Sequence, residues 1–116
     1  MRDFLLQCAG VGAIIVALIH GYLGEAKVFP RATIEPARLR TLIRLVWQAS
    51  TVAWIGCGVL LFATPWMDSA LARRWIVLTM IGVFGFSAFA NAWATRGRHF
   101  GWMALTAVVV MAVAGY

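Results

Sequence analysis

Four apolar runs constrain the fold of this 116-residue chain more than any other feature. Each of the first three has about the twenty residues that a helix needs to cross a membrane, and the fourth is slightly shorter. The runs cover residues 4–23, 43–63, 75–94 and 100–116. Since backbone amides in hydrocarbon must be bonded within their own segment, the runs are predicted to be helices.

Composition supports a membrane protein. Apolar residues make up 63% of the chain and charged residues only 12%, which is more hydrophobic material than a soluble domain of this size can bury. The later connections are short, so the helices should alternate in direction. The sequence therefore predicts an all-α fold, a four-transmembrane-helix antiparallel bundle that forms one integral membrane domain over residues 1–116. Its helices are expected at about residues 4–23, 36–63, 75–94 and 99–115.

A cleaved signal peptide is the alternative interpretation of the first run, because Arg2 precedes the apolar stretch. Asp3 is unfavourable in the basic segment that opens such a peptide. We therefore interpret residues 4–23 as a retained span.

The basic residues predict the orientation in the membrane. Seven lie on the connections after the first and third runs: Lys27, Arg31, Arg38, Arg40, Arg44, Arg96 and Arg98. Three lie on the opposite side: Arg2, Arg73 and Arg74. Basic connections favour the cytoplasm, so we expect a bacterial inner-membrane protein with both termini periplasmic. Arg31, Arg38, Arg40 and Arg44 are expected at the lipid headgroups, and the positive charge is attributed to topology and lipid rather than to nucleic acid.

Small residues predict close helix packing. Ala9, Ala13, Ala17 and Gly21 recur at every fourth position of the first run, and Gly82, Gly85, Ala88 and Ala92 form a similar stripe in the third. The last helix is expected to tolerate larger residues, for example at Ala112. Trp47, Trp66, Trp75, Trp93 and Trp102 lie near span ends and are expected to anchor the interfaces. Cys8 and Cys57 are expected to be free packing residues.

Polar residues of the predicted helices converge on the basic end. His20, Gln48 and Asn91 lie within about one turn of that end, and His99 begins the fourth helix. Such groups are costly in hydrocarbon and should point into the bundle. One interpretation is that they hydrogen-bond one another and hold the helices together. The other is that they form a ligand or cofactor site.

Glu25 belongs to this polar layer but lies just beyond the first helix. One interpretation is an ion pair with Arg44 or Arg96 that holds the loop. The alternative is a proton or cation relay with His20.

Two cofactor chemistries are alternatives at the histidines, although no cofactor is predicted. The stretch "ALIHGYL" resembles the single-helix antenna proteins, which implies that His20 could ligate bacteriochlorophyll beside the small residues Gly21 and Gly24. His99 could be a second axial ligand of a b-type haem. A zinc ion held by His20, Glu25 and His99 has suitable ligand types but no known spacing, and no metal site is predicted.

Known small four-span transporters match poorly. Small multidrug exporters depend on a glutamate well inside their first helix, where this chain has glycine and alanine, and the glycine-asparagine pore pattern of small fluoride channels is missing. "HGYLGEAKV" followed by "RLRTLIRLVWQASTVAWIG" resembles an uncharacterised group of small bacterial four-span proteins. The matching residues are His20, Leu23, Gly24, Glu25, Arg44 and Trp47. Gln48 stands where the group has a second histidine, and Ala26 stands where a basic residue is usual.

These observations predict a non-catalytic protein, because no nucleophile lies with a base and no buried acidic pair is present. The expected function is a small accessory or structural subunit that associates with lipid and with a larger membrane complex. The alternatives are a small oligomeric transporter or channel, and a redox or pigment subunit that binds haem or bacteriochlorophyll through His20.

Reporter fusions test the orientation. A fusion at the C-terminus is expected to report a periplasmic location and a fusion near Arg31 a cytoplasmic one, because the basic connections remain inside. The opposite pattern would overturn the orientation and place the polar layer on the other side of the membrane.

Overall fold

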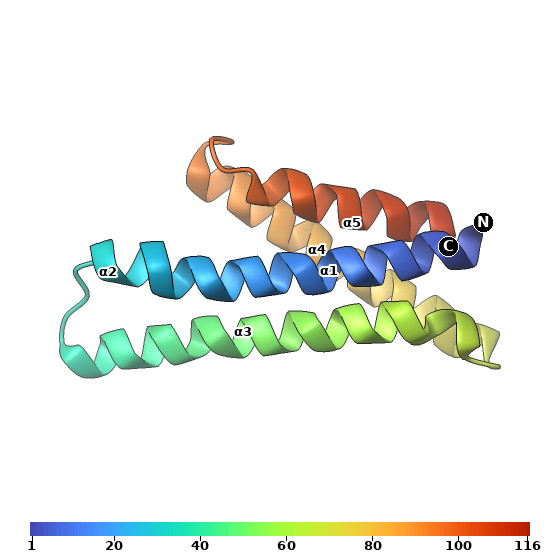
Figure 1. Ribbon diagram of the computed structural model, residues 1–116, viewed down its shortest axis with the longest axis horizontal. Coiled ribbons are helices and arrows are strands. Elements are labelled where there is room, and N and C mark those ends of the chain that lie inside the picture. Colours follow the sequence, from blue (N-terminus) through green and yellow to red (C-terminus); the bar gives the residue numbers. More distant parts are fainter.

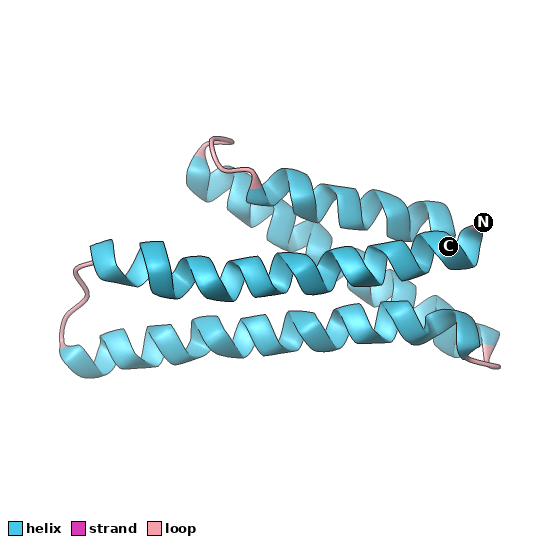
Figure 2. Ribbon diagram, viewed as in Figure 1, coloured by secondary structure: helices cyan, strands magenta, loops and turns pink.

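The computed structural model describes residues 1–116 and contains helices but no strands (Figure 2). Its elements are α1 (Arg2–Leu23), the π-helical turn η1 (Gly24–Val28), α2 (Phe29–Arg31), α3 (Ala37–Ala63), the 3-10 turn η2 (Thr64–Trp66), α4 (Ala70–Thr95) and α5 (Gly101–Gly115). The four long helices form an antiparallel bundle with both termini at the same end (Figure 1). The predicted all-α four-helix bundle is therefore confirmed.

Three continuous helical segments are long and apolar enough to cross a membrane, and α5 is a shorter apolar helix. The chain is thus a small multi-pass membrane protein. The first segment runs from Arg2 to Arg31, past the expected end at Leu23, because η1 and α2 continue α1 without a break. Pro30 is compatible with this extension, since it directly follows the π-helical turn, where the hydrogen bonds change from the π-helical to the α-helical spacing.

Local capping explains the other helix ends. Ser69 precedes α4, and its side chain accepts a hydrogen bond from the Ala72 backbone N–H at 3.2 Å, so α4 begins five residues before the expected Trp75. Arg96 and Gly97 have positive φ angles and end α4. The Gly97 N–H then bonds to the Ala92 carbonyl at 2.8 Å, as in a typical C-terminal cap.

The bundle is open on one side. α1 packs against both α3 and α5, and α4 packs mainly on α5. α3 and α4 make few contacts, which include the edge-to-face pair of Trp54 and Phe84 at 6.0 Å between ring centroids. Figure 1 shows α4 crossing behind α1 at an angle to α3, so the two helices diverge toward the basic end. We call the opposite end, which holds both termini, the terminal end.

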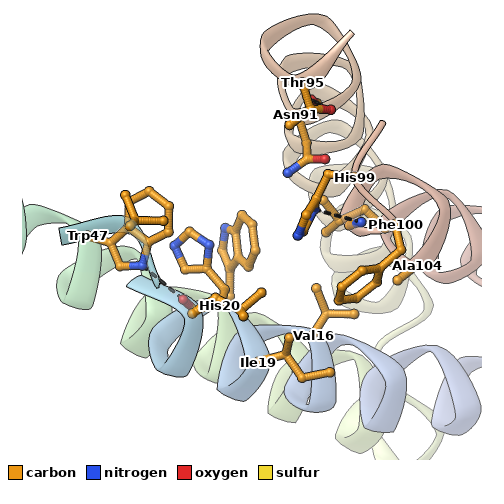
Figure 3. Close-up of a pocket in the computed structure, with 14 residues that line it drawn as sticks. Val16, Ile19, His20, Trp47, Asn91, Thr95, His99, Phe100 and Ala104 are labelled. Atoms are coloured by element: carbon orange, nitrogen blue, oxygen red, sulfur yellow. Dashed lines mark hydrogen bonds between the residues drawn. The ribbon is translucent and has the colours of Figure 1, made fainter. Parts of the chain in front are cut away.

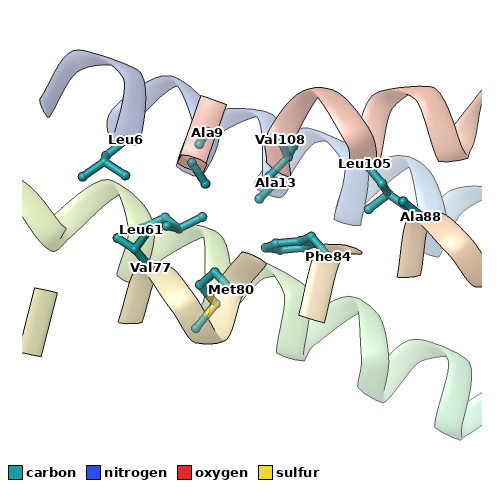
Figure 4. Close-up of a cluster of buried hydrophobic side chains, with 11 residues drawn as sticks. Leu6, Ala9, Ala13, Leu61, Val77, Met80, Phe84, Ala88, Leu105 and Val108 are labelled. Atoms are coloured by element: carbon teal, nitrogen blue, oxygen red, sulfur yellow. The ribbon is translucent and has the colours of Figure 1, made fainter. Parts of the chain in front are cut away.

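The core follows the small-residue stripe of α1. Ala9, Ala13, Ala17 and Gly21 are all buried, as predicted. Figure 4 shows Ala9 and Ala13 facing a cluster to which all four long helices contribute, including Leu61, Phe84 and Val108. The small residues of α1 therefore bring its backbone close to its neighbours.

Two packing expectations are wrong. Gly82 and Gly85 of α4 have no atom within 4 Å of the position that a Cβ would take, so they make no close helix contact, although Ala88 is buried. Ala112 of α5 is only 1% exposed, because α5 packs against α1 as well as α4. Ala112 therefore has no free space for a larger side chain.

Ala13→Leu is expected to destabilise the bundle by about 2 kcal/mol, because the added atoms have no space in a packed core. Ala107→Leu is the matched control, since Ala107 is an exposed residue of α5. Thermal melts in detergent compare the two variants. Equal melting temperatures would show that Ala13 does not pack as described.

Candidate functional site

An aromatic stack links α1 to α3 at the basic end. The His20 imidazole lies parallel to the Trp47 indole, with 4.2 Å between centroids and 7° between planes, and Trp54 lies on it at 4.7 Å. Trp47 and Trp54 are seven residues apart, so they share one face of α3. We call His20, Trp47 and Trp54 the aromatic stack. Trp47 is therefore half-buried in the bundle and does not act only as the expected interfacial anchor.

Hydrogen bonds orient the His20 ring. The Ser50 hydroxyl donates to the Trp47 carbonyl at 2.6 Å, so the Ser50 oxygen is left to accept from His20 Nε2 at 3.1 Å. The neutral ring therefore carries its proton on Nε2. The Trp47 indole N–H also donates to the His20 backbone carbonyl at 2.9 Å. The ring and the backbone carbonyl of His20 are thus both hydrogen-bonded to α3.

Glu25 is held by α3 in the η1 turn. Its carboxylate accepts hydrogen bonds from Arg44 Nε and from Gln48 Nε2, each at 3.0 Å. Gln48 Nε2 also donates a hydrogen bond to the Gly21 carbonyl at 3.2 Å. Arg44 is thus the ion-pair partner of Glu25, and it is one of the two arginines that were expected in this role. The ion pair is partly exposed and fixes the end of α1 against the start of α3.

Two glycines allow α1 and η1 to lie this close to α3. A Cβ on Gly24 would overlap the Trp47 indole, and a Cβ on Gly21 would lie 2.8 Å from the Thr51 methyl carbon. The space beside His20 that could have received a flat macrocycle is therefore filled by side chains of α3. The interpretation of His20 as a tetrapyrrole ligand loses the room on which it depended.

A second polar group lies across the bundle on α4 and the α4–α5 connection. His99 precedes α5, and its Nδ1 accepts a hydrogen bond from the Gly101 N–H at 3.0 Å, so the neutral ring carries its proton on Nε2. A Cβ on Gly101 would lie 2.8 Å from His99 Nδ1 and 3.1 Å from Asn91 Nδ2, so the two side chains are neighbours. Asn91 Oδ1 is buried and accepts no hydrogen bond. We call Asn91 and His99 the polar corner.

A cavity of about 180 Å³ separates the aromatic stack from the polar corner (Figure 3). Most of its remaining wall is apolar and comes from α1, η1 and α5. Ile19, Val28 and Phe100 line it and are also exposed, so its rim lies on the apolar surface of the protein. The arrangement can hold a small apolar group beside hydrogen-bonding side chains.

The structure divides the predicted polar layer into two parts. His20, Gln48 and Glu25 lie together on α1, η1 and α3, whereas Asn91 and His99 face them across the cavity. His20 forms a hydrogen bond with Ser50, a residue that was not predicted to belong to the polar layer. The spacing of Trp47, Ser50 and Trp54 on one face of α3 is the signal that could have found this partner. No three His, Cys, Asp or Glu side chains are grouped so as to hold a metal ion, which leaves the zinc alternative without a ligand set.

The arginines expected at the headgroups lie on exposed positions of the basic end. Arg44 pairs with Glu25, and Arg40 donates to the Phe29 carbonyl at 2.8 Å. Arg31 and Arg38 are exposed. At the terminal end, Arg73 pairs with Asp3 at 2.6 Å, so charge also joins α4 to the start of α1.

Comparison with protein family models, with curated proteins and with solved structures finds no match. The chain's function must therefore be argued from its own residues.

Gly24→Ala is expected to destabilise the protein by about 2 kcal/mol, because the new methyl group would displace Trp47 from His20. Gly56→Ala is the matched control: Gly56 is exposed on α3 with nothing within 4 Å of a Cβ, so stability should be unchanged or slightly higher. Thermal melts measure both effects. A Gly24→Ala protein as stable as the parent would refute the close approach of η1 to Trp47.

Proposed function

We propose that this chain is a non-catalytic accessory subunit that packs against a larger membrane protein complex through the outer face of α3. The observation that carries the proposal is an unused stripe of small residues. Ala49, Ala53 and Gly56 lie at helical spacing on α3, and all three are exposed. We call these three residues the α3 stripe.

Small residues in membrane helices permit close approach of another helix. The small residues of α1 serve this purpose inside the bundle, where Gly10 and Gly58 bring the α1 and α3 backbones together. The α3 stripe has the same composition but no neighbour, and Val52 beside it is 69% exposed. Small side chains on a face without neighbours leave room for a helix of another protein, so the stripe is compatible with close docking of a partner.

The polar groups support a structural role more than a chemical one. Glu25 is engaged by Arg44 and Gln48, and His20 Nε2 is engaged by Ser50. A general acid or base needs a group that is free to exchange a proton with a substrate. The aromatic stack and the Glu25 ion pair instead hold α1 against α3, which presents the outer face of α3 as a fixed surface.

The setting proposed for this subunit is a bacterial inner membrane with both termini periplasmic. The concentration of basic residues at one end supports this orientation. The resemblance of His20, Leu23, Gly24, Glu25, Arg44 and Trp47 to uncharacterised small four-span proteins is compatible with it and implies no activity.

A small oligomeric transporter or channel is the second candidate. The same α3 stripe that could receive a different protein could receive a second copy of this chain, which would make the complex a homo-oligomer. The test must therefore distinguish the two occupants.

Ala53→Leu is expected to release the chain from its complex, because the larger side chain prevents close approach at the α3 stripe while facing away from the bundle. Ala107→Leu, on exposed α5, is the control. Each variant and the parent are extracted from native membranes with mild detergent, and the size of the complex is compared by native electrophoresis. We expect a large parent complex, a large Ala107→Leu complex and a smaller Ala53→Leu species with an unchanged melting temperature.

Two differently tagged copies expressed together identify the occupant. Co-capture of the two tags through the α3 stripe would replace the accessory role with the oligomeric alternative. A parent protein that migrates as a monomer, or an Ala53→Leu complex of parental size, would refute the proposal.

A further inference from the structure

We propose that the cavity between the aromatic stack and the polar corner binds the head group of a quinone, a planar, electron-poor ring that carries carbonyl oxygens. This inference is independent of the proposed docking of α3. It rests on the size of the cavity, on the hydrogen-bonding groups that face it, on its aromatic wall and on its position.

The size fits one substituted ring. The cavity measures about 180 Å³. An engineered apolar cavity of about 150 Å³ in another protein holds one benzene molecule. The space between the helices therefore admits a six-membered ring with small substituents, and it is far too small for a tetrapyrrole.

The polar corner supplies donors for a ligand oxygen. His99 Nδ1 is occupied by the Gly101 N–H, so Nε2–H is the group that remains for a ligand. Asn91 Nδ2 is the second donor, because it forms no hydrogen bond within the chain and lies close to His99 around Gly101. Figure 3 shows both side chains directed at the cavity from the α4 side. Amide and imidazole groups without partners are unfavourable in an apolar site, and a carbonyl oxygen that accepts from both would satisfy the two donors.

The opposite wall favours an electron-poor ring. Indole faces are rich in π-electrons, and Trp47 and Trp54 both line the cavity, although the His20 ring between them covers one face of each. Contact of the quinone ring with the aromatic side chains of this wall adds to the burial of its apolar surface. The His20 Nε2–H group already donates to Ser50 and is not available to a ligand. The aromatic stack therefore supplies packing surface, and the polar corner supplies the hydrogen bonds.

The cavity can be reached from the lipid. Its rim residues Ile19, Val28 and Phe100 are apolar and exposed, and α3 and α4 diverge toward this end of the bundle. A ligand that dissolves in hydrocarbon can therefore enter sideways without crossing the packed core. Quinones have this solubility, whereas charged metabolites do not.

The experiment uses the whole protein in lipid nanodiscs with a matched pair of probes. Duroquinone is a benzoquinone with methyl groups at the other ring carbons, and durene is the same tetramethyl ring without carbonyls. Binding is followed through the indole N–H resonances of Trp47 and Trp54, with Trp75 at the terminal end as the internal control. We expect saturable shifts at Trp47 and Trp54 only, with duroquinone at least about fivefold tighter than durene, which is the value of one neutral hydrogen bond.

Variants assign the donors. Asn91→Leu should weaken duroquinone binding about fivefold and leave durene binding unchanged, because it removes one hydrogen bond. Ser87→Ala is the control, since Ser87 is a partly buried polar residue of α4 that bonds only to the Val83 carbonyl and does not line the cavity. His99→Phe keeps an aromatic ring without the donor and should also weaken duroquinone about fivefold, so the test survives if Asn91→Leu fails to fold.

Three results would overturn the inference. They are the absence of a saturable shift at Trp47 and Trp54, equal affinity for duroquinone and durene, and unchanged duroquinone binding in the folded polar-corner variants. A lipid that permanently fills the cavity would give the first result.

Discussion

The close contact between α1 and α3 is the constraint on which the rest of the structure depends. In lipid, helices gain little from hydrophobic burial, so their association relies on close packing and on hydrogen bonds between helices. Gly10 and Gly58 allow the two backbones to meet, and Gly24 allows the Trp47 indole to lie against η1. The hydrogen bond from Trp47 to the His20 carbonyl and the ion pair of Glu25 with Arg44 form only at this distance.

The same contact determines where the bundle is open. Because α3 uses one face for α1, and α4 packs mainly on α5, few contacts remain between α3 and α4. Two consequences follow from this arrangement. The outer face of α3 keeps its small residues uncovered, and a cavity remains where the two helix pairs diverge at the basic end. The proposed partner surface and the proposed ligand site thus have one structural cause.

The sequence was a good guide to those features that depend on helical periodicity. Ala9, Ala13, Ala17 and Gly21 recur with the helix, so the packed stripe of α1 could be predicted, and alternating helices made the polar residues converge on one end. Rotation of a helix about its own axis is not encoded in this way. The glycines of α4 therefore looked like a contact stripe although Gly82 and Gly85 face open space. The spacing of Trp47, Ser50 and Trp54 likewise indicates a shared face of α3 but not that this face meets His20.

The first loop illustrates another limit of prediction from sequence. Gly24, Glu25 and Pro30 are typical of a connection, and the helix was expected to end before them. In the structure their interactions are satisfied in a helical conformation: Gly24 makes room for Trp47, Glu25 pairs with α3, and Pro30 directly follows the π-helical turn. These tertiary contacts outweigh local propensity, and no local pattern reports them.

The two halves of the polar layer differ in a way that separates structural from ligand-binding groups. Glu25, Gln48 and His20 have partners within the protein, and each partner lies on the neighbouring helix, so their polar atoms contribute to helix association. Asn91 and His99 lie at similar depth and line a cavity, and Asn91 Nδ2 and His99 Nε2 have no hydrogen-bond partner within the chain. A polar side chain that only held helices together would be expected to find a partner among them, because an unpaired polar group in hydrocarbon is unfavourable. The polar corner is thus the part of the layer whose chemistry is completed by a molecule other than the chain itself.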